Sequence, residues 1–145
     1  MYIEKVSDVS GELHEVLERL IPQLGIHKAP PTSGELMALV KSESSTLLIA
    51  RYPDQNGEIF GMLTLTVYRV PTGIRSIVED VVVDETMRRR GIAEALLRHA
   101  IDLARGAGAN GVSLTSNPQR EAANWLYLAL GFKRRETNAY FYETK

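Results

Sequence analysis

The stretch from Val81 to Ala93, VVVDETMRRRGIA, carries the clearest chemical pattern in the sequence. A run of valines typical of a buried strand passes through a short polar turn into the first turn of an amphipathic helix. The unpaired N–H groups of a helix start bind anions, helped by the positive end of the helix dipole. Three arginines at positions 88–90 add positive charge, and Gly91 lets an anion approach the backbone closely. The pattern predicts a cradle for a phosphate or pyrophosphate group.

The stretch contains neither the GxxxxGK[S/T] pattern of a P-loop nor the GxGxxG pattern of a dinucleotide-binding loop. A second interpretation remains open from these features alone. It is an ordinary helix start with solvated arginines and a glycine that lets the helix pack on a sheet.

The same residues match a family signature. Arg88-Arg89-Arg90-Gly91-Ile92-Ala93 fits the R/Q-x-x-G-x-G/A signature of the GNAT acyltransferase superfamily. The segment NWLYLALGF, from Asn124 to Phe132, is similar to the late LYxxxGF helix of that family. The expected order of strands and helices also resembles theirs, so the resemblance covers nearly the whole chain. It implies an N-acetyltransferase that moves an acetyl group from acetyl-CoA to a primary amine of a small molecule or peptide by direct attack.

Within that family, the motif spacing most resembles the polyamine and diamine acetyltransferases. Val78-Glu79-Asp80 stands where that branch has Ile/Leu-Glu-Asp, with the same spacing to Arg88 and on to Tyr127. We take this as evidence for the role of Glu79 and not for a polyamine substrate. One position departs from the pattern: seven residues before the late tyrosine the family usually has Asn, and this chain has Arg120.

Glu79 is the candidate general base. An alkyl amine with a pKa near 10.4 is mostly protonated at neutral pH, so a proton must leave before the nitrogen attacks a thioester. Side chains alternate along a strand, so we expect Glu79 to share a face with Val81 and Val83. That face lies beside the pantetheine if the cofactor follows the family's path, and Glu79 takes the proton directly or through a water. The alternative is a buried carboxylate paired with an arginine such as Arg75.

Tyr127 is the candidate general acid, because a phenol with a pKa near 10 can protonate the departing thiolate. Helical spacing divides the late helix into a site side with Arg120, Ala123, Asn124 and Tyr127 and a core side with Ala122, Leu126, Ala129 and Leu130. The alternative is a half-buried tyrosine whose hydroxyl anchors the helix.

The residues expected to bind acetyl-CoA come from the cradle, the strand before it and the late helix. They are Val81, Val82, Val83, Arg88, Arg89, Arg90, Gly91, Ile92, Ala93, Asn117, Arg120, Asn124 and Tyr127. Backbone N–H groups around Val81 to Val83 are expected to polarise the thioester carbonyl. We expect no metal, because His14, His27 and His99 lie far apart with no ligand spacing.

Periodicity predicts the elements that position these residues. Strands are expected at Tyr2 to Val6, Thr46 to Tyr52, Ile59 to Val70, Ile74 to Asp84 and Val112 to Thr115. The tail from Phe132 to Glu143 is expected to form one or two more, around Glu136 to Asn138. Helices are expected from Asp8 or Ser10 to about Leu24, after Thr32 or Ser33, from Arg90 to Arg105, and from Ser116 or Asn117 to about Leu130. Asn56-Gly57 predicts a two-residue hairpin turn.

The result is an α/β fold (α+β by some schemes). We expect a GNAT-like, mixed and mostly antiparallel central sheet with helices on both faces, in the order β-α-α-β-β-β-α-β-α-β. A length of 145 residues predicts a single domain over residues 1–145.

Composition bounds the remaining choices. The chain has no cysteine, which removes disulfides and thiol nucleophiles. The start lacks a signal-peptide pattern and no long apolar run follows, so a cytoplasmic protein is expected. The net charge of −1 argues against a general nucleic-acid binder. Residues 1–72 hold six Lys/Arg and nine Asp/Glu and residues 73–145 eleven and nine, which favours an anionic ligand in the second half.

Two matters stay open at this point. A non-catalytic acyl-CoA-binding sensor would keep the cradle and lack turnover, and it is the alternative to an enzyme. The acceptor amine is not specified: the resemblance implies a site built from the loop Ile26 to Ser33, the turn near Thr72 and the last strands. A homodimer is a further expectation.

Overall fold

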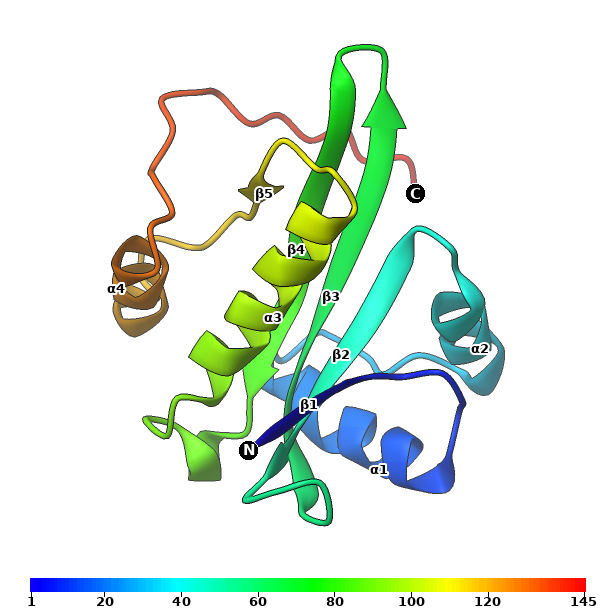
Figure 1. Cartoon of the computed structure of the whole chain (residues 1–145). Helices are drawn as coiled ribbons and strands as arrows, with labels where there is room; N and C mark the ends of the chain where they lie inside the picture. The colour runs from blue at the N-terminus through cyan, green and yellow to red at the C-terminus, as the bar shows by residue number, and fades with distance from the viewer. The chain divides into compact units, whose positions relative to one another are not determined.

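A five-stranded sheet holds the core of the computed structural model, which describes residues 1–145. Its strands are β1 (Tyr2–Lys5), β2 (Ser45–Tyr52), β3 (Glu58–Val70), β4 (Gly73–Val83) and β5 (Val112–Ser113). They lie in sequence order, and every neighbouring pair is antiparallel except β4 and β5, which are parallel (Figure 1). The predicted mixed, mostly antiparallel sheet is confirmed.

The chain divides into two compact units, Met1–Thr115 and Ser116–Lys145. The first holds the sheet with helices α1 (Gly11–Leu20), α2 (Ser33–Lys41) and α3 (Ile92–Gly106), and the short 3-10 turns η1 (Ile21–Gln23) and η2 (Glu85–Met87). The second holds α4 (Glu121–Ala129). A single domain over residues 1–145 stays a prediction.

Local side chains explain where α1 and α2 begin. Ser10 caps α1, its hydroxyl accepting from the N–H of Leu13 (3.1 Å). Thr32 and Glu35 form a capping box at α2, with Thr32 Oγ1 accepting from Glu35 N–H (3.2 Å) and Glu35 Oε1 from Thr32 N–H (2.9 Å). Pro22 ends α1 earlier than predicted, because the chain tightens into η1 after Leu20.

Helices cover both faces of the sheet, with α3 in front of it and α1 and α2 behind in Figure 1. One core joins α1 and α2 to the strands; its buried members are Val6, Leu13, Val16, Leu17, Leu20, Leu36, Leu47, Ile49, Ile59, Met62 and Val82. The other face buries Leu48, Ala50, Leu63 and Leu65 with α3. Gly61 marks how closely α3 approaches, since a Cβ there would lie 2.8 Å from Ile92 Cγ2.

A bulge interrupts β4 just before the cradle. Thr64 pairs with Glu79 and Met62 with Val82, so Leu63 lies opposite two residues, Asp80 and Val81. Asp80 takes a positive φ of 52° there. Paired residues on neighbouring strands share a face. Glu79 therefore shares its face with Val82, the face on which α1 and α2 pack. The prediction that it shares a face with Val81 and Val83 is wrong, because the extra residue shifts the alternation.

The connection between β2 and β3 also differs from the prediction. Residues 53–57 form it, in place of a two-residue turn at Asn56-Gly57. Asp54 sets the turn earlier: its Oδ1 accepts from Asn56 N–H (2.8 Å) and its carbonyl O from Gly57 N–H (2.9 Å).

The second unit departs most from the sequence pattern. α4 starts at Glu121, later than predicted, because Asn117 closes a turn in which its Oδ1 accepts from Gln119 N–H (2.9 Å). The helix stops before Gly131, which takes a φ of 103° as expected for a glycine stop. The strand expected around Glu136 to Asn138 is wrong, because KRRETNAYFYETK offers no alternation of apolar and polar residues that would bury one face.

Candidate active site

The cradle lies between the end of β4 and the start of α3. The chain leaves β4 at Val83, passes through η2 and turns with positive φ at Arg89 (63°) and Gly91 (79°), and α3 then begins at Ile92. Gly91 caps the helix, and nothing lies within 4 Å of the position a Cβ would take there. This is open space beside the helix N-terminus.

The backbone N–H groups of this turn have no acceptor in the protein. Met87 N–H donates to the carbonyl O of Asp84 (2.9 Å), and the next donor is Ala95 N–H, which bonds the carbonyl O of Gly91 (3.0 Å). From Arg88 to Glu94 no backbone N–H donates to a protein acceptor. A helix start alone leaves only its first few donors unpaired. The longer run, beside exposed arginines, fits a doubly charged pyrophosphate.

The three arginines lie on the surface around this turn. The guanidinium carbon of Arg90 stands 5.9 Å from the centroid of the Tyr52 ring, a cation–π contact that restrains one of them. Arg88 and Arg89 form no ion pair, so their charge is free for an anionic ligand.

The strand before the cradle has an open edge. β5 pairs with β4 only at Ser76 and Ile77, and no strand pairs with that edge from Val78 to Val83. Val82 is buried in the core, whereas Val81 and Val83 are half-buried, so the strand is less buried than its run of valines suggests. Backbone groups on this edge can bond a linear chain such as pantetheine.

Glu79 lies on β4 four residues before Val83 and is exposed. It makes no ion pair, and Arg75 instead donates to Thr72 Oγ1 (3.1 Å). The alternative of a buried carboxylate paired with Arg75 is therefore wrong. A solvated carboxylate beside an open strand edge can accept a proton from an amine.

Tyr127 belongs to the second unit. Its side chain is buried, with 7% of the residue exposed, and its ring meets the Phe132 ring edge-on at 6.0 Å. Burial raises the pKa of Tyr127 above its ordinary value, and the charge of Arg120 lowers it by less. The phenol therefore keeps its proton at neutral pH, as an acid must. The assignment of Ala122 and Ala129 to the core side is wrong, since both are exposed while the large Tyr127 ring is buried.

Of the other predicted site residues in this unit, Asn124 makes hydrogen bonds to nearby backbone groups. Asn124 Nδ2 donates to the carbonyl oxygens of Asn117 (3.0 Å) and Arg120 (2.9 Å), and so holds the start of α4. Arg120 is exposed. Glu79, the valines and the cradle thus lie in one unit and Asn117, Arg120, Asn124 and Tyr127 in the other.

Sequence patterns missed a polar cluster at the root of the cradle. Asp84 is buried and pairs with Arg19 of α1, with 2.8 Å between Asp84 Oδ2 and Arg19 Nε. Asp84 Oδ1 also accepts from Thr86 N–H (3.0 Å) and Thr86 Oγ1 (2.9 Å). Burial opposes the charge of Asp84, but the bonds from Thr86 and the charge of Arg19 lower its pKa below the ordinary value. The Asp-x-Thr spacing signals this turn in the sequence; its partner Arg19 has no such signal.

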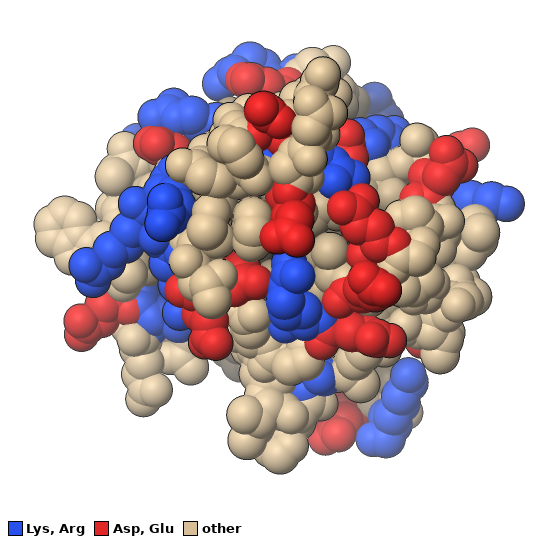
Figure 2. Space-filling model, turned by 90° about the horizontal axis from the view of Figure 1, so that it is seen from below, with Lys and Arg blue, Asp and Glu red and all other residues tan.

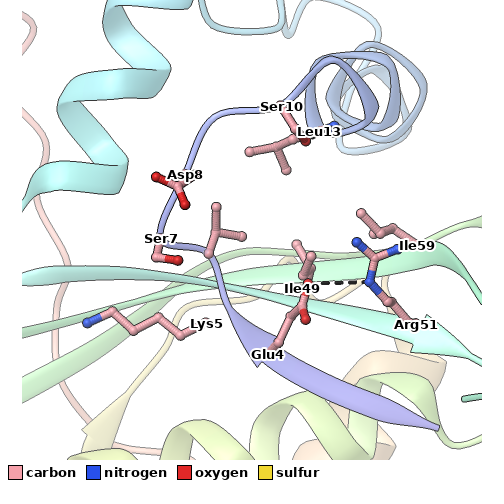
Figure 3. A pocket seen from close by; sticks show the side chains of 10 residues that line it. Glu4, Lys5, Ser7, Asp8, Ser10, Leu13, Ile49, Arg51 and Ile59 are labelled. Carbon is pink, nitrogen blue, oxygen red and sulfur yellow. Dashed lines mark hydrogen bonds and ion pairs between the residues drawn. The ribbon is translucent and has the colours of Figure 1, made fainter. Parts of the chain in front are cut away.

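A separate cavity of about 210 Å³ lies between the β1–α1 loop and the sheet (Figure 3). Its lining includes Arg51, which pairs with Glu4 (3.3 Å) and with Glu12 of α1 (2.8 Å). None of the predicted site residues lines it. No group of three or more acidic or histidine side chains could hold a metal ion, and none of the helices has the length and apolarity to cross a membrane.

The sequence profile of the acetyltransferase (GNAT) family matches residues 13–132. The chain belongs to this family. Its members use acetyl-CoA as acetyl donor, and this chain is accordingly an acyl-CoA-dependent N-acetyltransferase. No curated protein matches the sequence.

Solved structures of similar fold cover nearly the whole GNAT chain. An aminoglycoside acetyltransferase from an uncultured soil metagenomic sample shares 20% identity at a TM-score of 0.82, covering 99% of this chain and 95% of that one. A Trypanosoma brucei acetyltransferase shares 22% at 0.77, covering 98% and 100%. A transcriptional regulator from Bacillus halodurans shares 24% at 0.79, covering 98% and 100%. At these identities the likeness shows the fold.

Replacing Gly91 by Asp tests the cradle. The new carboxylate would stand in the open space beside the unpaired N–H groups and repel the pyrophosphate, so the Kd for CoA should rise at least about tenfold. Gly108→Asp is the matched control: its φ of 80° equals that of Gly91 within a degree, and it follows the other end of α3. Calorimetry in which folded Gly91→Asp binds CoA as tightly as Gly108→Asp would contradict the assignment.

Asp84→Asn should cost stability in a pH-dependent way. Because the folded-state pKa of Asp84 is lowered, its charge stabilises the protein above the ordinary pKa of about 3.9, and this contribution disappears as the pH falls through the lower folded value. At neutral pH the variant should lose about 1–3 kcal/mol of unfolding free energy. Urea unfolding should show the difference from wild type shrinking below about pH 4. A difference that stays constant with pH would sink the account.

Proposed function

We propose that this GNAT enzyme acetylates a primary amine of a small molecule or peptide by direct attack, with Glu79 as general base and Tyr127 as general acid. The observation that carries the proposal is the unpaired N–H run of residues 88–94, reached from Glu79 along the open edge of one strand. The arrangement supports an anion-anchored cofactor with a carboxylate upstream of it.

The residues of the chain handle protons. Bound acetyl-CoA supplies a thioester whose carbonyl carbon accepts the amine nitrogen and whose thiolate leaves. Glu79 takes a proton from the ammonium form of the acceptor, directly or through a water, and so produces the neutral nucleophile. Backbone N–H groups on the open edge at Val81 to Val83 hold the carbonyl oxygen as negative charge develops. Tyr127, kept protonated by its burial, gives its proton to the leaving sulfur.

The remaining proposed cofactor contacts follow the same division. Arg88, Arg89, Arg90, Gly91, Ile92 and Ala93 would hold the pyrophosphate, and Asn117, Arg120, Asn124 and Tyr127 would contact other parts of CoA. Arg120 is the least typical member, because the family usually has Asn there and the side chain is solvent-exposed.

The acceptor is proposed to be cationic. Glu12, Glu15 and Glu18 lie exposed along α1, and Figure 2 shows acidic side chains gathered on the face seen from below. Solved structures of similar fold include aminoglycoside acetyltransferases, and nothing in the comparisons supports the polyamine and diamine branch. We therefore propose that the acceptor is a small compound with several amines or a peptide amine. We do not assign the chain to a particular branch of the family. A cytoplasmic location and a homodimer stay predictions.

Glu79→Gln keeps the size of the side chain and removes the proton acceptor. Turnover should fall by about 10²- to 10⁴-fold near neutral pH and recover partly at higher pH, where more of the amine is already free. The matched control is Asp80→Asn, the next residue, which is also exposed and whose positive φ suits Asn. Steady-state rates of CoA release on a panel of amines measure both. Equal kcat values for Glu79→Gln and wild type on the true substrate would refute the assignment of Glu79 as general base.

Tyr127→Phe removes only the phenolic hydroxyl. We expect kcat to fall by about 10²- to 10⁴-fold with little change in the Kd for acetyl-CoA. Tyr140→Phe, in the same unit and 90% exposed, is the control that should keep full activity. If the wild-type protein binds CoA yet acetylates no amine in a broad panel, the result favours the non-catalytic acyl-CoA-binding sensor.

A further inference from the structure

The end of α1 is tied directly to the strands beneath the cradle. Arg19 reaches across with two groups: Nε pairs with Asp84 Oδ2 at 2.8 Å, and Nη2 donates to the carbonyl O of Ile59 at 2.6 Å. The guanidinium also lies over the Phe60 ring, 5.8 Å from its centroid. One planar side chain thus joins α1, β3 and the first residue after β4.

Asp84 in turn is hydrogen-bonded to the first residues of the loop. Its own N–H donates to the carbonyl O of Phe60 (2.7 Å), while its carboxylate accepts from Thr86 N–H and Thr86 Oγ1. Its carbonyl O accepts from Met87 N–H, the last donor before the unpaired run. The side chain of Asp84 is only 6% exposed, so its negative charge needs the partners it has.

Gln23 in η1 adds a second tie. Its Oε1 accepts from the N–H of Glu85 (2.9 Å), the residue after Asp84, and its Nε2 donates to the carbonyl O of Arg19 (3.2 Å). The amide therefore bonds both sides of the junction. Together the two side chains fix the residues that open the loop to the last turn of α1.

Such an anchor is needed because the backbone N–H groups of the rest of the loop make no hydrogen bonds within the protein, and among its arginines only Arg90 has a ring contact. From Arg88 to Glu94 no N–H bonds the protein, Arg89 holds a positive φ, and three like charges repel one another. Donors serve an anion only when they are held in converging positions before it arrives. The fixed points on the strand side are Asp84 and Glu85.

We propose that Arg19 and Gln23 are positioning residues for CoA: they hold the opening of the cradle loop through Asp84 and Glu85, and so set the affinity for the pyrophosphate without touching it. The inference rests on the proposed pyrophosphate role of residues 88–94. Other ion pairs of the chain differ from this junction. Arg105 and Asp102 pair at 2.8 Å on the far half of α3 with side chains 73% and 74% exposed, so they hold nothing in place.

The test compares Arg19→Met with Arg105→Met. Arg19→Met keeps the apolar stem and removes both polar contacts. The Kd for CoA should therefore rise by about 10- to 100-fold, the loss of affinity typical when a residue that orients a binding group is replaced. The KM for acetyl-CoA should rise with it, whereas kcat at saturation and the KM for the amine should stay within about twofold of wild type. Arg105→Met, which removes an exposed pair, should leave all four unchanged.

A purely structural role would lower the melting temperature and leave the CoA affinity of the folded protein unchanged. Gln23→Leu serves if Arg19→Met does not fold, because it keeps the bulk of the side chain, removes the bonds to Glu85 and Arg19, and should raise the Kd by a smaller factor. Wild-type affinity in the folded variants overturns the proposal. Gly91→Asp, measured alongside, separates the causes: if it weakens CoA binding while these variants do not, only the junction is refuted, and if it does not, the cradle assignment fails too.

Discussion

The N–H groups between Arg88 and Glu94 are the constraint around which the candidate site is built. No acceptor inside the protein satisfies them, so water or a ligand must. A loop with unpaired donors and three arginines would not keep one shape by itself. The fold supplies the restraint from both ends. β4 leads into the loop at Asp84, which α1 holds through Arg19, and α3 leads out of it, packed against β3 where Gly61 leaves no room for a side chain.

Strand β4 sets the order in which the parts of the candidate site follow one another. The second half of β4 leads from the exposed Glu79 toward the cradle. Its outer edge has no partner strand from Val78 to Val83, because β5 pairs only with Ser76 and Ile77. The bulge at Asp80 and Val81 turns Glu79 to the face that α1 and α2 share. A carboxylate, an open strand edge and a run of unpaired N–H groups therefore follow one another along the chain. This is the order that an extended acyl-CoA would need if Glu79 and residues 88–94 act as proposed.

Features set by neighbouring residues could be predicted from the sequence. The start of α3 after Gly91, the caps at Ser10 and Thr32 and the glycine after α4 all depend on a few adjacent side chains. The binding of a pyrophosphate at that helix start stays a prediction. Features set by distant pairing could not. The bulge exists only because Leu63 of another strand lies opposite two residues, and the Arg19–Asp84 pair joins segments remote in the sequence. The start of α4 was missed because Asn117 closes a turn where helix capping was expected.

The central claim is that the unpaired donors of residues 88–94 hold the CoA pyrophosphate. Amide chemical shifts of ¹⁵N-labelled protein, titrated with CoA and separately with pantetheine, test it most directly, since the two ligands share the arm and only CoA carries the pyrophosphate. The account predicts that CoA moves the amide resonances of residues 88–94 more than any others, and that pantetheine leaves them in place while shifting those along β4. Saturating CoA that shifts amides elsewhere and leaves residues 88–94 unmoved would contradict it.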